Sequence, residues 1–293
     1  MLLDNFVHIL FTLPSSVQLA MVFVFSALVG SFLNVVIYRL PIILERDWQA
    51  QAREILQLPA EDSPFFGLSK PRSRCRDCGR VIRAWENIPV ISYLLMRGRC
   101  RGCGAKISIF YPLVELSTAV LATFVFWRLG GNAQGFFALF FVFALIALAG
   151  IDLKTQLLPD NITLPLMWAG IILSFWALYV PLETAVIGAL LGYLSLWLVA
   201  TLFKLLFKKD GMGLGDAKLL AAIFTWVHFQ YFPLVLIVAC LVGLVVTVVQ
   251  RLLNAEKVIN NPLPFGPYLA LGGLVALLYG QELVVWYTRL LLG

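Results

Sequence analysis

The chain has 293 residues, of which 61% are hydrophobic and only 13% are charged. Water-soluble domains carry about 45–50% apolar and about 25% charged residues, so this composition excludes a soluble enzyme and predicts an integral membrane protein. The formal net charge of +6 follows the predicted loops and forms no single basic face, so we expect no nucleic-acid partner.

Eight segments are predicted to be membrane helices, because a bilayer core requires roughly 20 apolar residues per helix. The sixth segment is the shortest and ends in polar residues. The predicted fold class is therefore an all-α polytopic membrane protein with about eight transmembrane helices. The segments lie at about residues 14–38, 110–127, 134–151, 162–180, 184–207, 217–230, 232–250 and 264–288.

The distribution of basic residues predicts the orientation of these helices, because cytoplasmic loops are enriched in Lys and Arg. If residue 1 lies outside, all 22 Lys and Arg residues except Arg128 and Arg289 fall on the inner side. Both termini are then outside. The long polar stretch, residues 39–109, becomes a small cytoplasmic domain between a first span, residues 1–38, and a membrane core, residues 110–293.

Four cysteines in the polar stretch form two Cys-x-x-Cys turns separated by 21 residues, and a glycine follows each turn. This spacing is typical of a zinc site, in which four thiolates close the tetrahedral coordination shell and leave no position for substrate. We therefore predict a structural zinc ion. A pair of disulfides is the alternative, which the reducing cytoplasmic side disfavours. The predicted ligands are Cys75, Cys78, Cys100 and Cys103.

Two aspartates lie at the ends of predicted spans, Asp152 after the third and Asp216 at the start of the sixth. Span parity places both on the cytoplasmic side at similar depth, so they can meet. Ionisable residues at membrane depth are costly and usually functional. Two adjacent carboxylates can share one proton and act as base and acid in amide hydrolysis. Glycines at 211, 213 and 215 allow close backbone approach.

Other interpretations of these acids stay open on spacing alone. Asp216 after a glycine is a typical helix N-cap, and Asp152 could pair with Lys154 or Lys218. Intramembrane acids also serve proton-coupled transporters, and a zinc-anchored assembly scaffold would need no catalytic acid at all. Asp160 is predicted to cap the fourth span. Neither a phosphate-binding loop nor a His-Glu-x-x-His metalloprotease motif occurs in the sequence.

The ordered motifs together resemble the type IV prepilin peptidases, which are bifunctional leader peptidases and N-methyltransferases. The resemblance covers nearly the whole chain. In one respect the chain departs from the family, which often has Pro where Arg76 and Arg101 follow the first cysteine of each turn. The motifs are residues 30–41 (GSFLNVVIYRLP), the two cysteine turns, 86–89 (ENIP), 111–115 (YPLVE), 152–160 (DLKTQLLPD) and Gly-x-Gly-Asp at 213–216.

This resemblance implies that Asp152 and Asp216 are the catalytic pair of a Gly-x-Gly-Asp membrane aspartic protease. It implies that prepilins and type II secretion pseudopilins are cleaved at the cytoplasmic face of the bacterial inner membrane, in contact with membrane lipid. It also implies methylation of the new N-terminal residue, usually Phe, with S-adenosylmethionine. No motif locates the methyl-donor site, for which residues 30–41, Glu86, Asn87 and Glu115 are candidates.

Overall fold

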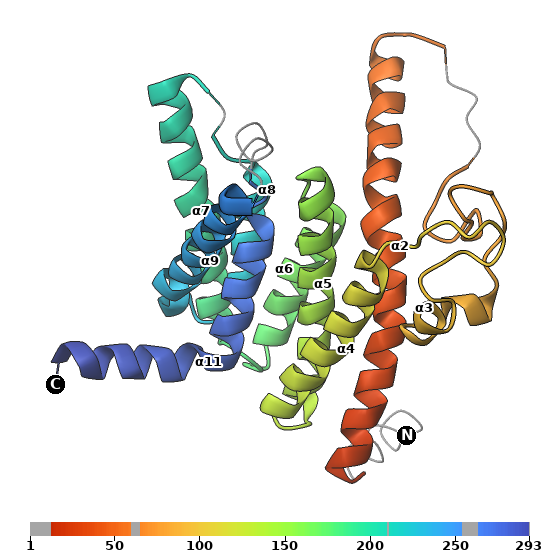
Figure 1. Cartoon of the computed structure of the whole chain (residues 1–293). Helices are drawn as coiled ribbons and strands as arrows, with labels where there is room; N and C mark the ends of the chain where they lie inside the picture. The colour runs from red at the N-terminus through yellow and green to blue at the C-terminus, as the bar shows by residue number, and fades with distance from the viewer. Residues whose placement is uncertain (1–12, 60–64, 210, 254–262, 293) are drawn as a thin grey trace. The chain divides into compact units, whose positions relative to one another are not determined.

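The computed structural model describes residues 13–59, 65–209, 211–253 and 263–292. Its regular elements in these ranges are all helical, which confirms the predicted fold class (Figure 1). Each of the eight predicted spans coincides with a helix. The elements are α2 (Ser15–Ile55), η1 (Ala84–Asn87), α3 (Ile91–Leu95), α4 (Phe110–Arg128), α5 (Ala133–Thr155), α6 (Asp160–Ser174), α7 (Leu182–Phe207), α8 (Leu214–Phe224), η2 (Phe229–Tyr231), α9 (Phe232–Leu253) and α11 (Gly266–Leu292).

Among the described residues, six helices are long and apolar enough to cross a membrane: α2, α4, α5, α7, α9 with its preceding turn, and α11. The chain is therefore a membrane protein, and six of its eight predicted spans meet this criterion of length and composition. The helices α6 and α8 have 15 and 11 residues. At 1.5 Å per residue they reach only about 23 Å and 17 Å, short of a bilayer core of about 30 Å.

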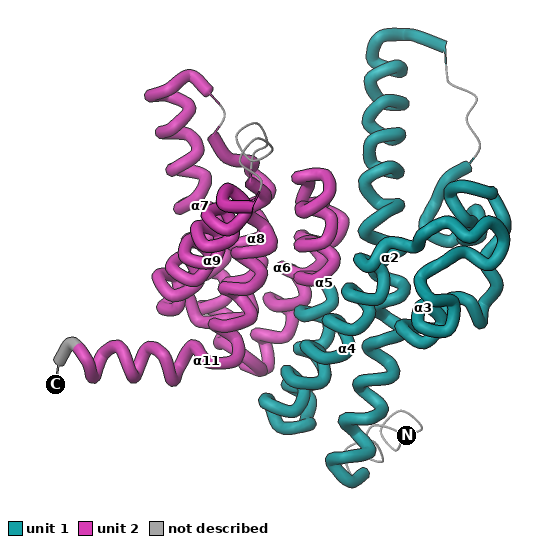
Figure 2. The backbone as a smooth tube through the Cα atoms, in the orientation of Figure 1, with its two compact units in different colours: residues 1–143 teal, residues 144–293 magenta. Residues whose placement is uncertain are grey.

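The chain divides into two compact units, residues 1–143 and 144–293 (Figure 2). The division falls within α5. The cysteine turns belong to the first unit, whereas Asp152 and Asp216 both belong to the second. Each unit is described separately below.

In the first unit, α4 packs against part of the longer helix α2 (Figure 1). A Cβ atom added at Gly30 of α2 would lie 2.9 Å from the Cα atom of Glu115 on α4, so glycine is needed for this close approach. The helix α2 also runs beyond the predicted span end at residue 38, through Pro41, to Ile55. The first part of the polar stretch is thus a continuation of the first helix.

In the second unit, α8 is packed against α6, α7 and α11. Its side chains from Leu219 to Phe224 are almost completely buried, which fits its even distribution of apolar residues. Two glycines four residues apart allow α7 to approach closely, because Cβ atoms at Gly188 and Gly192 would meet the carbonyl oxygens of Phe224 and Leu220 at 2.6 Å and 2.9 Å. This packing holds the start of α8, which carries Asp216, in a defined place.

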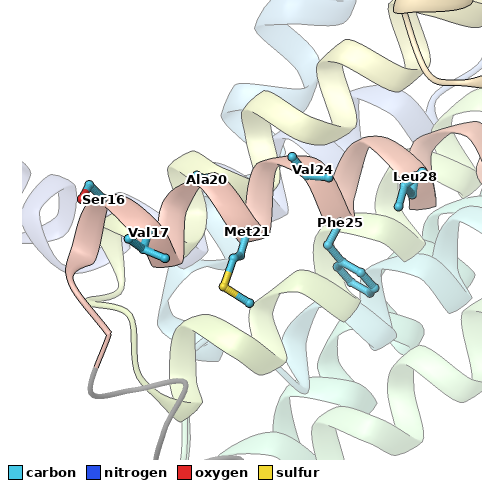
Figure 3. Close-up of a pocket in the computed structure, with 7 residues that line it drawn as sticks. All are labelled: Ser16, Val17, Ala20, Met21, Val24, Phe25 and Leu28. Carbon is cyan, nitrogen blue, oxygen red and sulfur yellow. The ribbon is translucent and has the colours of Figure 1, made fainter.

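A shallow hollow of about 600 Å³ lies along α2 near its N-terminal end (Figure 3). Its lining is almost wholly apolar and has no titratable group, so it cannot supply acid or base chemistry. Surfaces of this kind face lipid or another helix in a membrane protein. The lining residues are Ser16, Val17, Ala20, Met21, Val24, Phe25 and Leu28.

Candidate functional site

Asp152 lies in the last turn of α5 and is only 4% exposed. Its Oδ2 atom accepts a hydrogen bond of 2.8 Å from the backbone N–H of Gly266. Gly266 is the first residue of α11, where backbone N–H groups lack partners within the helix. The start of α11 thus orients the Asp152 carboxylate through Oδ2, and this hydrogen bond leaves the Oδ1 atom available for other partners.

Asp216 is the third residue of α8 and is 9% exposed. The N-cap of this helix is Gly213, and no side chain caps it, so the interpretation of Asp216 as a simple N-cap is wrong. The two aspartates are close enough for the charge of Asp152 to act on Asp216. Both residues belong to the second unit.

The Leu158 side chain packs against the backbone at Gly215, which precedes Asp216, and at Gly266, which donates to Asp152. Added Cβ atoms at Gly215, beside Asp216, and at Gly266 would lie 2.9 Å and 3.0 Å from carbon atoms of the Leu158 side chain. Both glycines therefore let the backbone pass close to one leucine. The contribution of Gly266 was not foreseen, because the Pro-Phe-Gly-Pro sequence at 264–267 indicates only a break before the last helix.

Lys218 does not pair with Asp152, contrary to one interpretation of the sequence. Its Nζ atom lies 2.8 Å and 2.7 Å from the two carboxylate oxygens of Asp160. Asp160 is the first residue of α6, and Pro159 occupies the N-cap position without a side-chain cap, so the predicted capping role of Asp160 is also wrong. The ion pair instead joins the start of α6 to α8.

The arrangement of Asp152 and Asp216 suits acid and base chemistry. Two buried carboxylates near each other cannot both ionise at low cost, and such an arrangement favours one ionised and one protonated member. The ionised member can take a proton from water, and the protonated member can donate one to a carbonyl oxygen or leaving amine. Such a pair can hydrolyse an amide.

Replacing Gly266 by Ala tests the orientation of Asp152. The new Cβ atom would lie 2.7 Å from Oδ2 of Asp152 and would displace the carboxylate. A shift of about 1 Å at a catalytic group can cost on the order of a hundredfold in rate, so we expect a loss of that order in amide cleavage. Gly213→Ala is the matched control, because its Cβ atom would meet nothing closer than 3.9 Å. Equal losses in both variants would contradict this explanation.

The four predicted metal ligands come together at the two Cys-x-x-Cys turns. Their Sγ atoms all lie within 4.8 Å of one another, and those of Cys75 and Cys103 are 3.8 Å apart. Zn–S bonds of about 2.3 Å in a tetrahedron place sulfur atoms about 3.8 Å apart, so this donor set fits zinc. All four thiols are free of disulfide bonds.

The backbone of the turns also favours metal binding. Gly79 and Gly104 adopt φ values of +69° and +74°, a region that glycine enters without a Cβ penalty. Their N–H groups donate to the carbonyl oxygens of Cys75 and Cys100. The N–H groups of Cys103 and Gly102 point to the Cys100 sulfur, and donors of this kind stabilise the thiolate that a metal requires.

The arginines that replace proline in the turns contact aromatic rings. Arg76 stacks on Tyr38 of α2 at 4.0 Å and donates to the Tyr111 hydroxyl of α4 at 3.0 Å. Arg101 stacks on Trp85 at 4.2 Å. Such cation–π contacts stabilise by roughly 0.5–1 kcal/mol at exposed sites. Arg76 thereby attaches the first turn to α2 and α4.

Of the residues suggested for methyl transfer, Glu86 is engaged in structural contacts. Its carboxylate accepts from the backbone N–H of Arg83 at 2.9 Å and forms an ion pair with Arg80. The Arg83 N–H and then the Arg80 guanidinium hold the pKa of Glu86 below its usual range. Asn87 ends the short helix η1. Glu115 is buried on α4 and is 8% exposed.

Comparison with known proteins gives consistent matches. The bacterial peptidase A24 N-terminal domain matches residues 24–129, and the type IV leader peptidase family matches residues 139–248. Three of the similar proteins carry the name prepilin leader peptidase/N-methyltransferase. The protein of Stutzerimonas stutzeri is 50% identical to this chain, over 91% of this chain and 92% of its own length. The Pseudomonas putida protein is 47% identical over 92% and 93%, and the Burkholderia pseudomallei protein, strain 1026b, is 43% identical over 92% and 87%. No solved structure matches the chain.

Proposed function

The chain belongs to the type IV leader peptidase family, and on this premise we propose that it removes the leader from type IV prepilins and methylates the new N-terminus. It is an enzyme with peptidase and N-methyltransferase activity, as the names of its relatives indicate. Neither a proton-coupled transporter nor a scaffold without activity agrees with these relatives. The observation that carries the peptidase role is the pair of buried aspartates, Asp152 at the end of α5 and Asp216 at the start of α8.

Asp152 and Asp216 are the proposed catalytic residues. One carboxylate takes a proton from the attacking water, and the other donates a proton to the scissile peptide. The N–H of Gly266 orients Asp152 through its 2.8 Å hydrogen bond, and the burial of α8 keeps Asp216 in place. Burial also limits water around the pair, which strengthens the interaction between their charges.

The proposed cofactors are one structural zinc ion and S-adenosylmethionine. The proposed zinc ligands are Cys75, Cys78, Cys100 and Cys103, whose sulfur atoms lie within 4.8 Å of one another. Four protein ligands leave no open coordination position, so the metal maintains the fold of residues 70–105. S-adenosylmethionine supplies an electrophilic methyl group to the acceptor amine.

The proposed location is the bacterial inner membrane, with both termini outside and the cysteine turns and aspartates on the cytoplasmic side. The asymmetric distribution of Lys and Arg supports this orientation. Residues 39–109 form the proposed cytoplasmic domain and residues 110–293 the protease core. Type II secretion pseudopilins are proposed as further substrates, and membrane lipid surrounds the spans.

Purified enzyme in detergent, incubated with a purified prepilin and S-adenosylmethionine, tests the function. We expect a shortened pilin whose mass also includes one added methylene group. A product of unchanged length and mass, from folded enzyme, would contradict both activities. Proton uptake by reconstituted vesicles without cleavage would favour the transporter.

A further inference from the structure

A row of polar residues crosses the interface between α2 and α4 in the first unit. Ser31 and Asn34 lie one turn apart on α2, and Tyr111 and Glu115 lie one turn apart on α4. The Ser31 hydroxyl lies beside the Glu115 carboxylate, and Nδ2 of Asn34 donates to the Tyr111 carbonyl oxygen at 3.0 Å. The two contacts follow one another along one face of each helix.

The row continues to the cysteine turns. Tyr38 lies one turn beyond Asn34 on α2, and Arg76 lies over its ring while donating to the Tyr111 hydroxyl. Arg76 is exposed, Tyr38 is 38% exposed, and Asn34 is only 4% exposed. The row therefore leads from an accessible end at the first cysteine turn to a buried end at Glu115.

Glu115 forms the buried end and is not used by the aspartate pair. Its Oε2 atom accepts a 2.7 Å hydrogen bond from the backbone N–H of Val90, and the neutral Ser31 side chain lies beside it. In the described part of the chain, no ion pair joins Glu115 to a Lys or Arg. A buried carboxylate with only neutral partners is costly unless a cation or a proton compensates it.

Asn34 supplies a second and independent indication of a ligand. Its amide nitrogen is bonded to α4, but its Oδ1 atom is buried and has no hydrogen-bond partner. An unpaired buried acceptor costs about 1–3 kcal/mol. One turn along the interface, the Glu115 carboxylate offers further acceptor capacity. A group that carries several N–H donors and a positive charge would satisfy both residues.

We propose that Glu115 and Asn34, supported by Ser31, bind an amine group of the methyl-transfer reaction. This proposal rests on the N-methyltransferase activity proposed above and assigns a site to it. Two molecules in that reaction carry such a group, namely the acceptor pilin at its free N-terminus and S-adenosylmethionine on its methionyl portion. Both amines present the same chemistry to a carboxylate and an amide oxygen.

The site also suits the proton balance of the reaction when it holds the acceptor. The bound ammonium first gives one proton to the Glu115 carboxylate, which frees the lone pair of the nitrogen. This lone pair then forms a bond to the methyl carbon as the C–S bond breaks, and the electrons of the broken bond stay on sulfur. The sulfonium becomes a neutral thioether, and the methylated nitrogen carries the positive charge.

Binding measurements on the full-length enzyme test the proposal without relying on turnover. The probes are a peptide with the mature pilin N-terminus and a free α-amine, the same peptide N-acetylated, and S-adenosylmethionine. Wild type should bind the free peptide more tightly than the acetylated one. Glu115→Gln keeps the size of the side chain and an acceptor for Val90, yet we expect it to weaken binding of one amine-bearing probe at least tenfold.

The affected probe identifies the source of the amine. Weaker binding of the free peptide alone assigns the site to the acceptor, and weaker binding of S-adenosylmethionine alone assigns it to the donor. Ser26→Ala is the matched control, because Ser26 is also a buried and unpaired polar residue of α2 but lies two turns from Asn34. This control should bind every probe as wild type does.

Leader cleavage and metal content report whether the variants are folded. If Glu115→Gln also loses cleavage, its weaker binding could reflect misfolding, and Ser31→Ala is then the test variant. Ser31→Ala removes only one hydroxyl and should weaken binding of the same probe about threefold. Unchanged affinity for both amine-bearing probes, in Glu115→Gln with intact cleavage or in Ser31→Ala, overturns the proposal. Failure of the wild-type enzyme to methylate any pilin would contradict the proposed N-methyltransferase function. That result is distinct from unchanged binding in the variants, which contradicts only the amine site.

Discussion

Asp152→Asn and Asp216→Asn should each abolish leader cleavage, with a loss of roughly 10²- to 10⁴-fold, the usual contribution of general acid–base catalysis. Asparagine keeps the shape of the side chain but cannot exchange a proton, so either substitution removes the shared-proton pair. In Asp152→Asn the Gly266 N–H can still donate to the amide oxygen, so the fold should persist. Cleavage of a purified prepilin in detergent measures the loss.

Asp160→Asn is the matched control for this experiment. It removes an acid near the proposed active site, whose carboxylate pairs with Lys218 while half exposed. Exposed ion pairs of this kind contribute only about 0–1 kcal/mol to stability, so cleavage should stay close to wild type. Near wild-type turnover in either Asp152→Asn or Asp216→Asn would rule out the proposed catalytic pair.

The double substitution Cys78→Ser with Cys103→Ser should release the metal and unfold residues 70–105. Two lost thiolates leave an incomplete coordination shell, and metal binding in such small modules is coupled to folding. Methylation of an already cleaved pilin should fall at least as severely as cleavage, because Arg76 of the first turn contacts Tyr38 and Tyr111 beside the proposed amine site. Elemental analysis gives the zinc content, and mass spectrometry of the pilin gives the methylation.

Asp216→Asn is the complementary variant for the same assay. It should still methylate a pilin supplied with a free N-terminal Phe, because the α2–α4 interface does not include Asp216. Failure to add a methyl group, in a folded variant that binds the donor, would show that one shared site performs both reactions. A metal-free but folded and active wild type would contradict the structural role of zinc.

The local features of this protein are predictable from its sequence because they depend on neighbouring residues. A run of apolar residues forms a helix in a bilayer, whatever its partners, since every backbone polar group must bond internally. Both cysteine turns form small loops whose spacing already suits one tetrahedral ion. Helix parity also places Asp152 and Asp216 on one side of the membrane, which is why their proximity could be expected.

Tertiary structure decided the partners of these residues, because packing selects among chemically equivalent groups that are distant in sequence. Lys218 could neutralise Asp152 or Asp160, and the position of α6 favours Asp160. Gly266 lies 114 residues from Asp152, and no periodic pattern connects the two. Their hydrogen bond exists because the close approach of α11 leaves room for a glycine alone.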